Sequence, residues 1–337
     1  MLSDKIYNLV LYNYAVKKIA RSVLSSSFLT NNFAYRSYYN RIMHKRMRDF
    51  SVKPFRVMLE NTNICNADCA FCPHVAMKRK TGVMDIGLSK KITDECKALE
   101  IEYLTIYGFG EPLLDKDFFS RVEYAKSRGL KRVTTNTNAF YMDKEKNKRL
   151  IDSGIDEVYI SFDAFSRDTF RKIRPNLDFE TIKGNILDLV DRRNKCGKNK
   201  PLVVLSFVES DINRKEVRDY LKYWQKRVDH VSISSAHNWT GDMQASCSSN
   251  SCLRDPCRLL WTDMFVLYNG DVALCCNDYE GRIILGNLRD SSMRDVWAGQ
   301  SLAKLRQKHL ERRFDEINIC KNCNYNYNYK SNWWVHK

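Results

Sequence analysis

Six short segments rich in β-branched and aromatic residues alternate with longer segments of helical composition between residues 55 and 238. Such an order predicts a parallel sheet with helical crossovers, either curved into a barrel or open. The fold class is therefore predicted to be α/β. The predicted strands are Phe55–Leu59, Tyr103–Tyr107, Arg132–Thr135, Glu157–Phe162, Leu202–Val208 and His230–Ile233, and the predicted helices are Ser89–Leu99, Phe118–Arg128, Lys144–Ser153, Phe179–Arg193 and Arg214–Lys226.

The alternation stops near Asn238, where a stretch rich in Ser, Asn and Cys runs to Pro256. Beyond it, Asn269-Gly270 predicts a hairpin turn, because both residues tolerate positive φ. We expect the hairpin strands at Met264–Tyr268 and Asp271–Leu274, and a helix at Met293–His309. The predicted organisation is a helical extension at 1–50, a barrel at 51–238, a bridging segment at 239–256, a small C-terminal unit at 257–325 and an aromatic, basic tail at 326–337.

The chain shows neither a signal-peptide pattern nor an apolar run long enough to cross a membrane, which predicts a reducing cytoplasmic environment. Clustered cysteines in that environment more often hold metal or carry out redox chemistry than form disulfides. The net charge of +16 favours anionic partners such as a phosphorylated substrate, nucleic acid or acidic lipid. Apolar residues at helical spacing near the N-terminus fit a helix packed on protein better than one lying on a membrane, although peripheral membrane contact stays open.

Three cysteines, Cys65, Cys69 and Cys72, directly follow the first predicted strand. Three thiolates can hold three irons of a four-iron, four-sulfur cube and leave the last iron open to a ligand. The alternative is a zinc site that uses His74 as its fourth ligand. The spacing favours the cluster.

The C-x3-C-x2-C spacing, with Phe71 before the last cysteine, resembles the signature of the radical S-adenosylmethionine enzymes. That resemblance implies a partial (β/α)6 TIM-type barrel and a 4Fe–4S cluster whose unique iron chelates the methionine moiety of S-adenosyl-L-methionine. It also implies reductive cleavage to a 5′-deoxyadenosyl radical, which removes a hydrogen atom from substrate. An external one-electron donor, such as a flavodoxin or ferredoxin, is implied as well.

Further motifs after later strands resemble elements of the same family. "YGFGEPLL" at 107–114 resembles a Gly-Gly-Glu-Pro type motif, in which Gly108 and Gly110 allow close backbone approach and Glu111 could accept from the ammonium group of the cofactor. "TTNTNAF" resembles a Thr-Asn-Gly element, with Asn138 favoured over Asn136, and "YISFDA" resembles a Ser-x-Asp element that would put Ser161 near the ribose.

A second cysteine set comprises Cys257, Cys275, Cys320 and Cys323, and four thiolates would saturate another cube. The surrounding segments resemble the C-terminal extension called SPASM in its single-cluster, Twitch form, which implies one auxiliary 4Fe–4S cluster. Zinc is the alternative metal, and Cys276 competes with Cys275. Two other cysteines that could enter the coordination are Cys247 and Cys252.

The C-terminal cysteine spacing is most similar to that of single-cluster aminocyclitol dehydrogenases. The resemblance implies oxidation, or another radical rearrangement, of a small polar molecule such as a sugar, an aminocyclitol or a nucleotide-linked sugar, with the auxiliary cluster as electron acceptor. Modification of a ribosomally made peptide is the alternative; RNA modification and a non-enzymatic zinc protein are less favoured. Candidates for a catalytic base are Glu209, Asp211, His237 and Asp278.

Overall fold

A computed structural model describes residues 47–48, 52–243 and 256–325 of the 337-residue chain. Within that part, nine strands form one sheet in the order β6-β5-β4-β3-β2-β1-β7-β8-β9. Neighbours from β6 to β7 pair in parallel, whereas β8 and β9 are antiparallel additions. The strands are β1 (Arg56–Leu59), β2 (Tyr103–Ile106), β3 (Arg132–Thr137), β4 (Glu157–Ser161), β5 (Leu202–Glu209), β6 (His230–Ser235), β7 (Asp263–Val266), β8 (Asp271–Ala273) and β9 (Ile284–Asn287).

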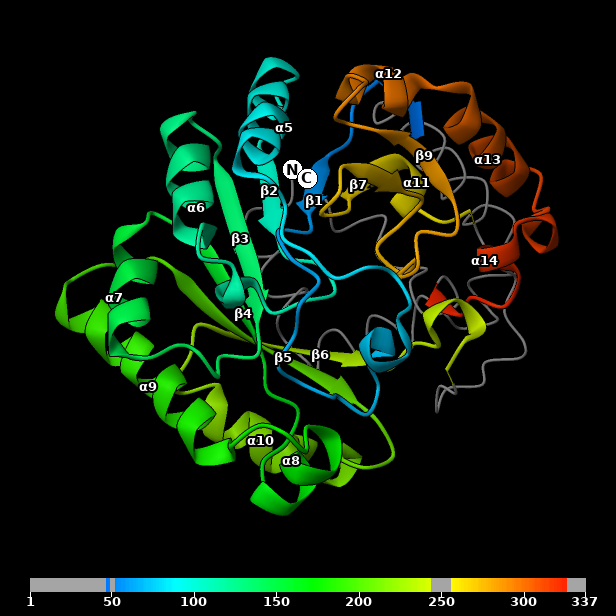
Figure 1. Ribbon diagram of the computed structural model, residues 1–337. Helices are drawn as coiled ribbons and strands as arrows, with labels where there is room; N and C mark the ends of the chain where they lie inside the picture. The colour runs from blue at the N-terminus through cyan, green and yellow to red at the C-terminus, as the bar shows by residue number, and fades with distance from the viewer. Residues whose placement is uncertain (1–46, 49–51, 244–255, 326–337) are drawn as a thin grey trace, which may run out of the picture.

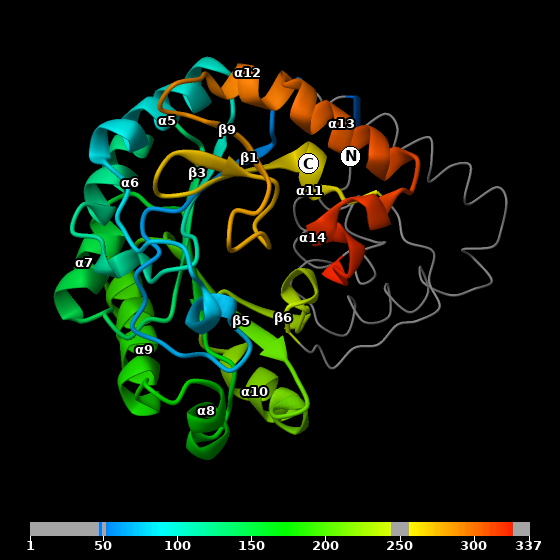
Figure 2. The ribbon, with the colours of Figure 1, turned by 45° about the vertical axis from the view of Figure 1, so that its right-hand side comes forward.

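Helices follow the parallel strands and cover the outer face of the curved sheet (Figures 1 and 2). This arrangement confirms the predicted partial barrel of six strand–helix units. The helices are α5 (Ile86–Ala98), α6 (Phe118–Ser127), α7 (Lys144–Asp152), α8 (Arg167–Ile173), α9 (Phe179–Lys195), α10 (Val217–Trp224), α11 (Leu259–Thr262), α12 (Met293–Ala298), α13 (Gln300–Leu310) and α14 (Asn318–Lys321).

The two faces of the sheet differ in chemistry because successive side chains of a strand point to opposite sides. Outward-facing residues such as Val57, Leu104 and Val158 are fully buried in the main core beneath the helices. The inner face is more polar: the Thr134 hydroxyl donates to the Thr105 hydroxyl at 3.0 Å across β3 and β2. The register therefore leaves a polar interior that opens at the carboxyl ends of the strands.

The C-terminal segment extends the same sheet, since β7 pairs in parallel with β1. The predicted hairpin is present as β7 and β8, with Gly270 at a φ of 95° in the turn. Strand β9 was not predicted. The parts at 51–238 and 257–325 thus share one sheet, while the predicted boundary between them stays a prediction.

The helix predicted at Met293–His309 is wrong as a single element. It is divided into α12 and α13 at Gly299, whose ψ of 150° is extended. Glycine has low helix propensity, so the break occurs where the helix is weakest. The short α8 was also not predicted, and it proves important for the site.

Two predictions concern the ends of the chain. The amphipathic N-terminal helix and the aromatic tail fall almost entirely on residues 1–46 and 326–337, which lie outside the described part. Both therefore stay predictions. Among the residues described, no helix combines the length and apolarity that a membrane crossing requires.

A glycine-to-alanine pair tests the close packing between β2 and the loop after β1. A Cβ added at Gly110 would lie 2.5 Å from the Thr62 carbonyl oxygen and 2.6 Å from that of Ile64. Gly110→Ala should therefore lower the free energy of unfolding by about 1–3 kcal/mol. Gly184, on the solvent side of α9, has no atom within 4 Å of such a Cβ, so Gly184→Ala should raise it by about 0.5–1 kcal/mol. Urea unfolding measures both; equal effects of the two substitutions would contradict the packing argument.

Candidate active site

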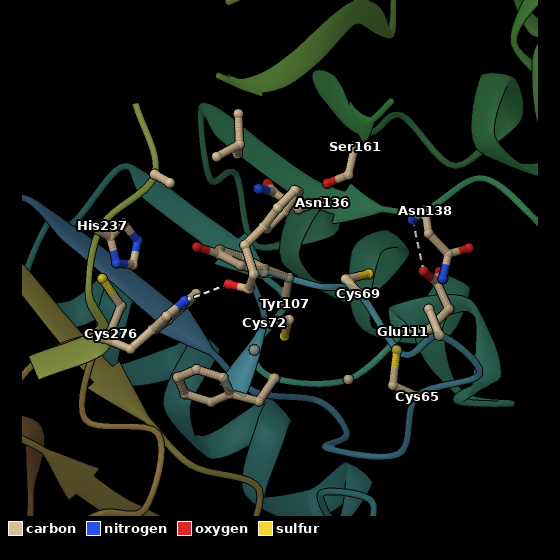
Figure 3. Close-up of a pocket in the computed structure, with 18 of the residues that line it drawn as sticks. Cys65, Cys69, Cys72, Tyr107, Glu111, Asn136, Asn138, Ser161, His237 and Cys276 are labelled. Atoms are coloured by element: carbon tan, nitrogen blue, oxygen red, sulfur yellow. Dashed lines mark hydrogen bonds between the residues drawn. The ribbon is translucent and has the colours of Figure 1, made fainter. Parts of the chain in front are cut away.

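The cysteine loop, residues 60–72, crosses the carboxyl ends of the parallel strands. Cys65, Cys69 and Cys72 line one pocket of about 310 Å³ there (Figure 3). Burial raises the pKa of the Cys65 thiol to about 11 and that of Cys72 to about 12. The thiols thus keep their protons until a metal displaces them, as thiolate ligation requires. Three cysteines that line one pocket fit the predicted cluster-binding role.

The zinc alternative gains no support from the structure. His74 Nε2 lies 2.9 Å from the Asn63 carbonyl oxygen, and His74 does not line the pocket.

Glu111 lies at the end of β2, where it is 2% exposed. Its Oε1 accepts hydrogen bonds from the Thr137 hydroxyl at 2.6 Å and from the Leu113 amide at 3.2 Å, and its Oε2 accepts one from the Asn138 amide at 2.8 Å. Burial raises the pKa of this carboxyl group, although the hydrogen bonds oppose the shift. Glu111 therefore joins β2 to β3 besides lining the pocket, and its predicted contact with the cofactor ammonium stays a prediction.

The two glycines of the "YGFGEPLL" motif let other groups come close to the backbone, as predicted. In the structure those groups belong to the protein itself. A Cβ on Gly108 would lie 2.3 Å from the Glu60 side chain, and Gly110 faces the carbonyl groups of the cysteine loop. The Glu111 amide donates to the Ile64 carbonyl at 2.9 Å. The glycines thus hold the cysteine loop against the end of β2.

The remaining predicted cofactor contacts also line the pocket. They are Phe71, Asn138 and Ser161, and Asn136 lines it too. Asn138 Nδ2 donates to Asn66 Oδ1 at 2.9 Å, which ties β3 to the cysteine loop. Ala139, at the position where the family usually has glycine, adopts a φ of 61°. Ala139 therefore adopts the left-handed backbone conformation that usually favours glycine.

Arg174 is a pocket residue that sequence reasoning missed. Its Nη1 donates to Cys69 Sγ at 3.1 Å, while its Nε donates to Asp163 Oδ2 at 2.9 Å. Asp163 in turn accepts from the Val208 amide at 2.7 Å. Desolvation lowers the pKa of Arg174, but the Asp163 carboxylate and the Cys69 and Cys72 thiols together raise it above its usual value. Since α8 aims this side chain at a cysteine 105 positions earlier, no local pattern could have revealed it.

Of the four candidate bases, only His237 lines the pocket. Asp211 forms an exposed ion pair with Arg214 at 2.7 Å. Asp278 is buried in a turn, where it accepts hydrogen bonds from the amides of residues 282 and 283. Glu209, at the end of β5, is not among the pocket-lining residues. The structure thus places three of the four away from the pocket.

His237 Nδ1 is buried and has no hydrogen-bond partner among the described residues, and the ring packs edge-on against Trp239 at 4.3 Å between centroids. Burial lowers the pKa of His237 to about 4. Its imidazole is therefore neutral near pH 7. A neutral imidazole that lines the pocket is a candidate proton acceptor, although its low pKa makes it a weak base.

The second cysteine set comes together from elements of the C-terminal segment. Burial raises the pKa of Cys275, and the neighbouring thiols of Cys276, Cys257, Cys320 and Cys323 raise it further. Cys276, in contrast, lines the pocket, at the same end as His237 in Figure 3. The structure thus gives Cys275 and Cys276 different surroundings, a distinction that sequence reasoning could not make. Cys247 and Cys252 lie outside the described residues.

Comparison with known families identifies the class of protein that this site and fold define. Residues 59–234 match the Radical SAM superfamily, and residues 257–324 match SPASM, an iron-sulfur cluster-binding domain. The first match covers more than half of the chain, so the protein belongs to the radical SAM superfamily and carries a SPASM domain. Both matches confirm the resemblance seen in the motifs and imply binding of 4Fe–4S clusters and S-adenosylmethionine.

Among curated proteins, the chain is similar to the S-adenosyl-L-methionine-dependent 2-deoxy-scyllo-inosamine dehydrogenase of Niallia circulans. The two are 24% identical over 274 residues, which cover 80% of this chain and 92% of the dehydrogenase. A probable GTP 3′,8-cyclase of Saccharolobus islandicus is 29% identical over 52% of this chain and 55% of its own length.

Solved structures support the same fold. BtrN in complex with AdoMet and 2-DOIA matches with a TM-score of 0.58 and 18% identity, covering 82% of this chain and 98% of BtrN. SuiB of Streptococcus suis bound to its precursor peptide SuiA matches with a TM-score of 0.63 and 15% identity, covering 81% of this chain and 72% of SuiB.

Proposed function

We propose that this protein is a radical oxidoreductase that removes a hydrogen atom from a carbon of a small polar molecule and oxidises it. The substrate class is a sugar, an aminocyclitol or a nucleotide-linked sugar. Two 4Fe–4S clusters serve the reaction, one held by Cys65, Cys69 and Cys72, and an auxiliary one held by Cys257, Cys275, Cys320 and Cys323. S-adenosylmethionine bound at the first would supply a 5′-deoxyadenosyl radical.

The observation that carries this proposal is the position of Cys276. It lines the pocket that holds the first three cysteines, and its neighbour in sequence, Cys275, lies with the second set. The peptide bond between Cys275 and Cys276 therefore links the second set to the pocket lining. An electron leaving a substrate radical in this pocket has a short route to the auxiliary site.

The protein side chains supply positioning and proton transfer. Hydrogen-bonding groups of Asn136, Ser161 and Ser234 line the inner face, which suits a molecule with several hydroxyl groups. Oxidation of a carbinol carbon loses one hydrogen atom, one proton and one electron. His237 would accept the proton, and an auxiliary cluster held by Cys257, Cys275, Cys320 and Cys323 would take up the electron.

His237→Ala should lower the yield of oxidised product per 5′-deoxyadenosine about 100-fold or more, because hydrogen abstraction persists while proton removal fails. In the wild type, a pKa of about 4 keeps His237 unprotonated above about pH 5. Product formation should fall as the pH drops through that pKa, because the protonated ring cannot accept a proton. Chromatographic quantification of both products measures the ratio. Asp211→Asn, which changes an exposed carboxylate away from the pocket, should leave the ratio unchanged; an unchanged ratio in His237→Ala would remove His237 from this role.

A deuterium-transfer experiment tests the proposed function. Reduced, anaerobically prepared protein is incubated with S-adenosylmethionine and a deuterated cell extract that has been split by ultrafiltration. We expect deuterium in 5′-deoxyadenosine from the small-molecule fraction, with 2-deoxy-scyllo-inosamine as a defined reference compound. Deuterium transfer only from the macromolecules retained by the filter would favour the peptide-modifying alternative. Nuclease treatment of that fraction should then leave the transfer unchanged, because loss of transfer would indicate an RNA substrate.

A further inference from the structure

A tight turn at residues 238–241 follows β6, and its Trp239 lines the pocket. Trp239 and Thr240 have φ angles of 45° and 66°, and Gly241 has one of 100°. Positive φ is uncommon for residues other than glycine, and a β-branched residue such as threonine adopts it only when its surroundings impose it. Backbone strain of this kind gathers at functional sites, which makes the turn a candidate for a role in the reaction.

Asn238 binds this turn to the segment that follows α14. Its amide donates to Asn324 Oδ1 at 2.9 Å, and its Oδ1 accepts from the Asn324 amide at 3.0 Å. Its Nδ2 donates to the Asn322 carbonyl at 2.6 Å. The two segments also pack closely, because a Cβ on Gly241 would lie 2.6 Å from Asn322 Cβ. The three asparagines, which we call the asparagine clamp, thus hold the strained turn in place.

Trp239 packs against buried aromatic rings. Its ring centroid lies 5.8 Å from that of Phe109, which in turn lies 5.7 Å from that of Phe265. Phe109 and Phe265 are 7% and 1% exposed, whereas Trp239 is only partly buried. Trp239 Nε1 donates to the Phe71 carbonyl at 2.7 Å, which fixes the orientation of the indole. The indole is therefore a firmly supported apolar surface in the pocket wall.

The position of the indole within the pocket follows from its neighbour His237. The two ring centroids are 4.3 Å apart. Figure 3 shows His237 at one end of the pocket and Cys65 and Glu111 at the other. A molecule packed on the indole would therefore lie beside the proposed proton acceptor, while the cysteine end is where S-adenosylmethionine would bind.

We infer that Trp239 is a specificity-determining residue whose indole binds the C–H face of a ring-shaped polyol, and that Asn238 is a positioning residue that holds it there. In a cyclic polyol with equatorial hydroxyl groups, the axial C–H bonds form an apolar face. An aromatic side chain offers a flat, rigid surface to such a face, and the hydroxyl groups at the ring edge are left to polar side chains such as Asn136 and Ser234. The inference rests on the proposed function and narrows its substrate class to molecules that contain such a ring.

The test follows deuterium transfer to 5′-deoxyadenosine with full-length, cluster-loaded protein and increasing amounts of the small-molecule fraction of a deuterated cell extract. Trp239→Ala should need about tenfold more of the fraction than wild type for half-maximal transfer, because apolar contact with the ring is lost. The maximal rate should change by less than about threefold, as expected for a residue that contributes to binding. Iron content and S-adenosylmethionine cleavage without the fraction should match wild type.

Trp239→Phe separates the aromatic surface from the hydrogen bond to Phe71. It keeps an aromatic face and loses the donor, so its half-saturating amount should stay within about threefold of wild type. Tyr124→Phe, on the outer helix α6 and away from the pocket lining, is the matched control and should behave as wild type.

A double variant tests the asparagine clamp. Asn238→Ala should raise the half-saturating amount in the same direction as Trp239→Ala. Asn238→Ala/Trp239→Ala should bind no more weakly than Trp239→Ala alone, because both changes remove the same contact. Additive losses would remove Asn238 from the positioning role.

Each contrary outcome has its own meaning. Equal half-saturating amounts for Trp239→Ala and wild type would overturn the inference. Equal losses in Trp239→Ala and Trp239→Phe would assign the effect to the hydrogen bond with Phe71 and would overturn it as well. A wild type that cleaves S-adenosylmethionine but takes no deuterium from the fraction would instead overturn the proposed function. If Trp239→Ala loses iron, Trp239→Leu takes its place, since leucine fills space without a flat face.

Discussion

Cys72→Ala should abolish reductive cleavage of S-adenosylmethionine, with a loss of at least about 100-fold in 5′-deoxyadenosine formation. The reason is that only three protein thiolates would hold the cube that leaves one iron open, so none could be spared. Cys72 lines the pocket together with Cys65 and Cys69, and no fourth cysteine of the described residues lies in that loop. The measurement is 5′-deoxyadenosine after anaerobic reconstitution and reduction with dithionite.

Cys196→Ala provides the matched control. Cys196 is exposed at the end of α9, outside both cysteine sets, so its loss should leave cleavage at the wild-type rate. Wild-type cleavage by Cys72→Ala would refute the assignment of the cluster-binding loop. Loss of cleavage in both variants would point to a general effect of cysteine replacement.

Cys323→Ala should retain much of the S-adenosylmethionine cleavage yet lose nearly all oxidised product, because the electron acceptor is removed while the radical-generating cluster stays intact. Iron and sulfide should fall from about eight to about four of each per chain, as expected for the loss of one cube. The set that contains Cys323 lies together in the C-terminal segment, and none of its members lines the pocket with Cys65, Cys69 and Cys72. Chemical analysis of iron and sulfide, combined with product analysis, measures the effect.

Cys276→Ser distinguishes the two adjacent cysteines in the same experiment. Because Cys276 faces the pocket, this variant should keep about eight irons, whereas a drop to about four would make Cys276 the ligand in place of Cys275. Full product formation by a properly folded Cys323→Ala protein would exclude the auxiliary cluster as electron acceptor. Stoichiometric zinc without sulfide in the wild type would remove the radical chemistry altogether.

Local features of the sequence were sufficient for the barrel strands and the cysteine loop. Alternation of β-prone and helical segments predicted all six parallel strands to within a few residues, because each strand is a short apolar run whose period reflects burial. The Asn269-Gly270 pair predicted the hairpin, since turn chemistry acts over only a few residues. The helix broken at Gly299 shows the limit of such local rules, because composition does not say which of two allowed conformations a glycine adopts.

The sequence by itself determined the class of protein and the succession of strands and helices along the barrel, since motif spacing and periodicity are properties of neighbouring residues. Only the tertiary structure decided that Arg174 meets Cys69, that Cys276 faces the pocket while Cys275 does not, and that β7 continues the barrel sheet beside β1. These facts depend on strand register and on helix packing between segments far apart in the chain. No pattern within one segment records such distances.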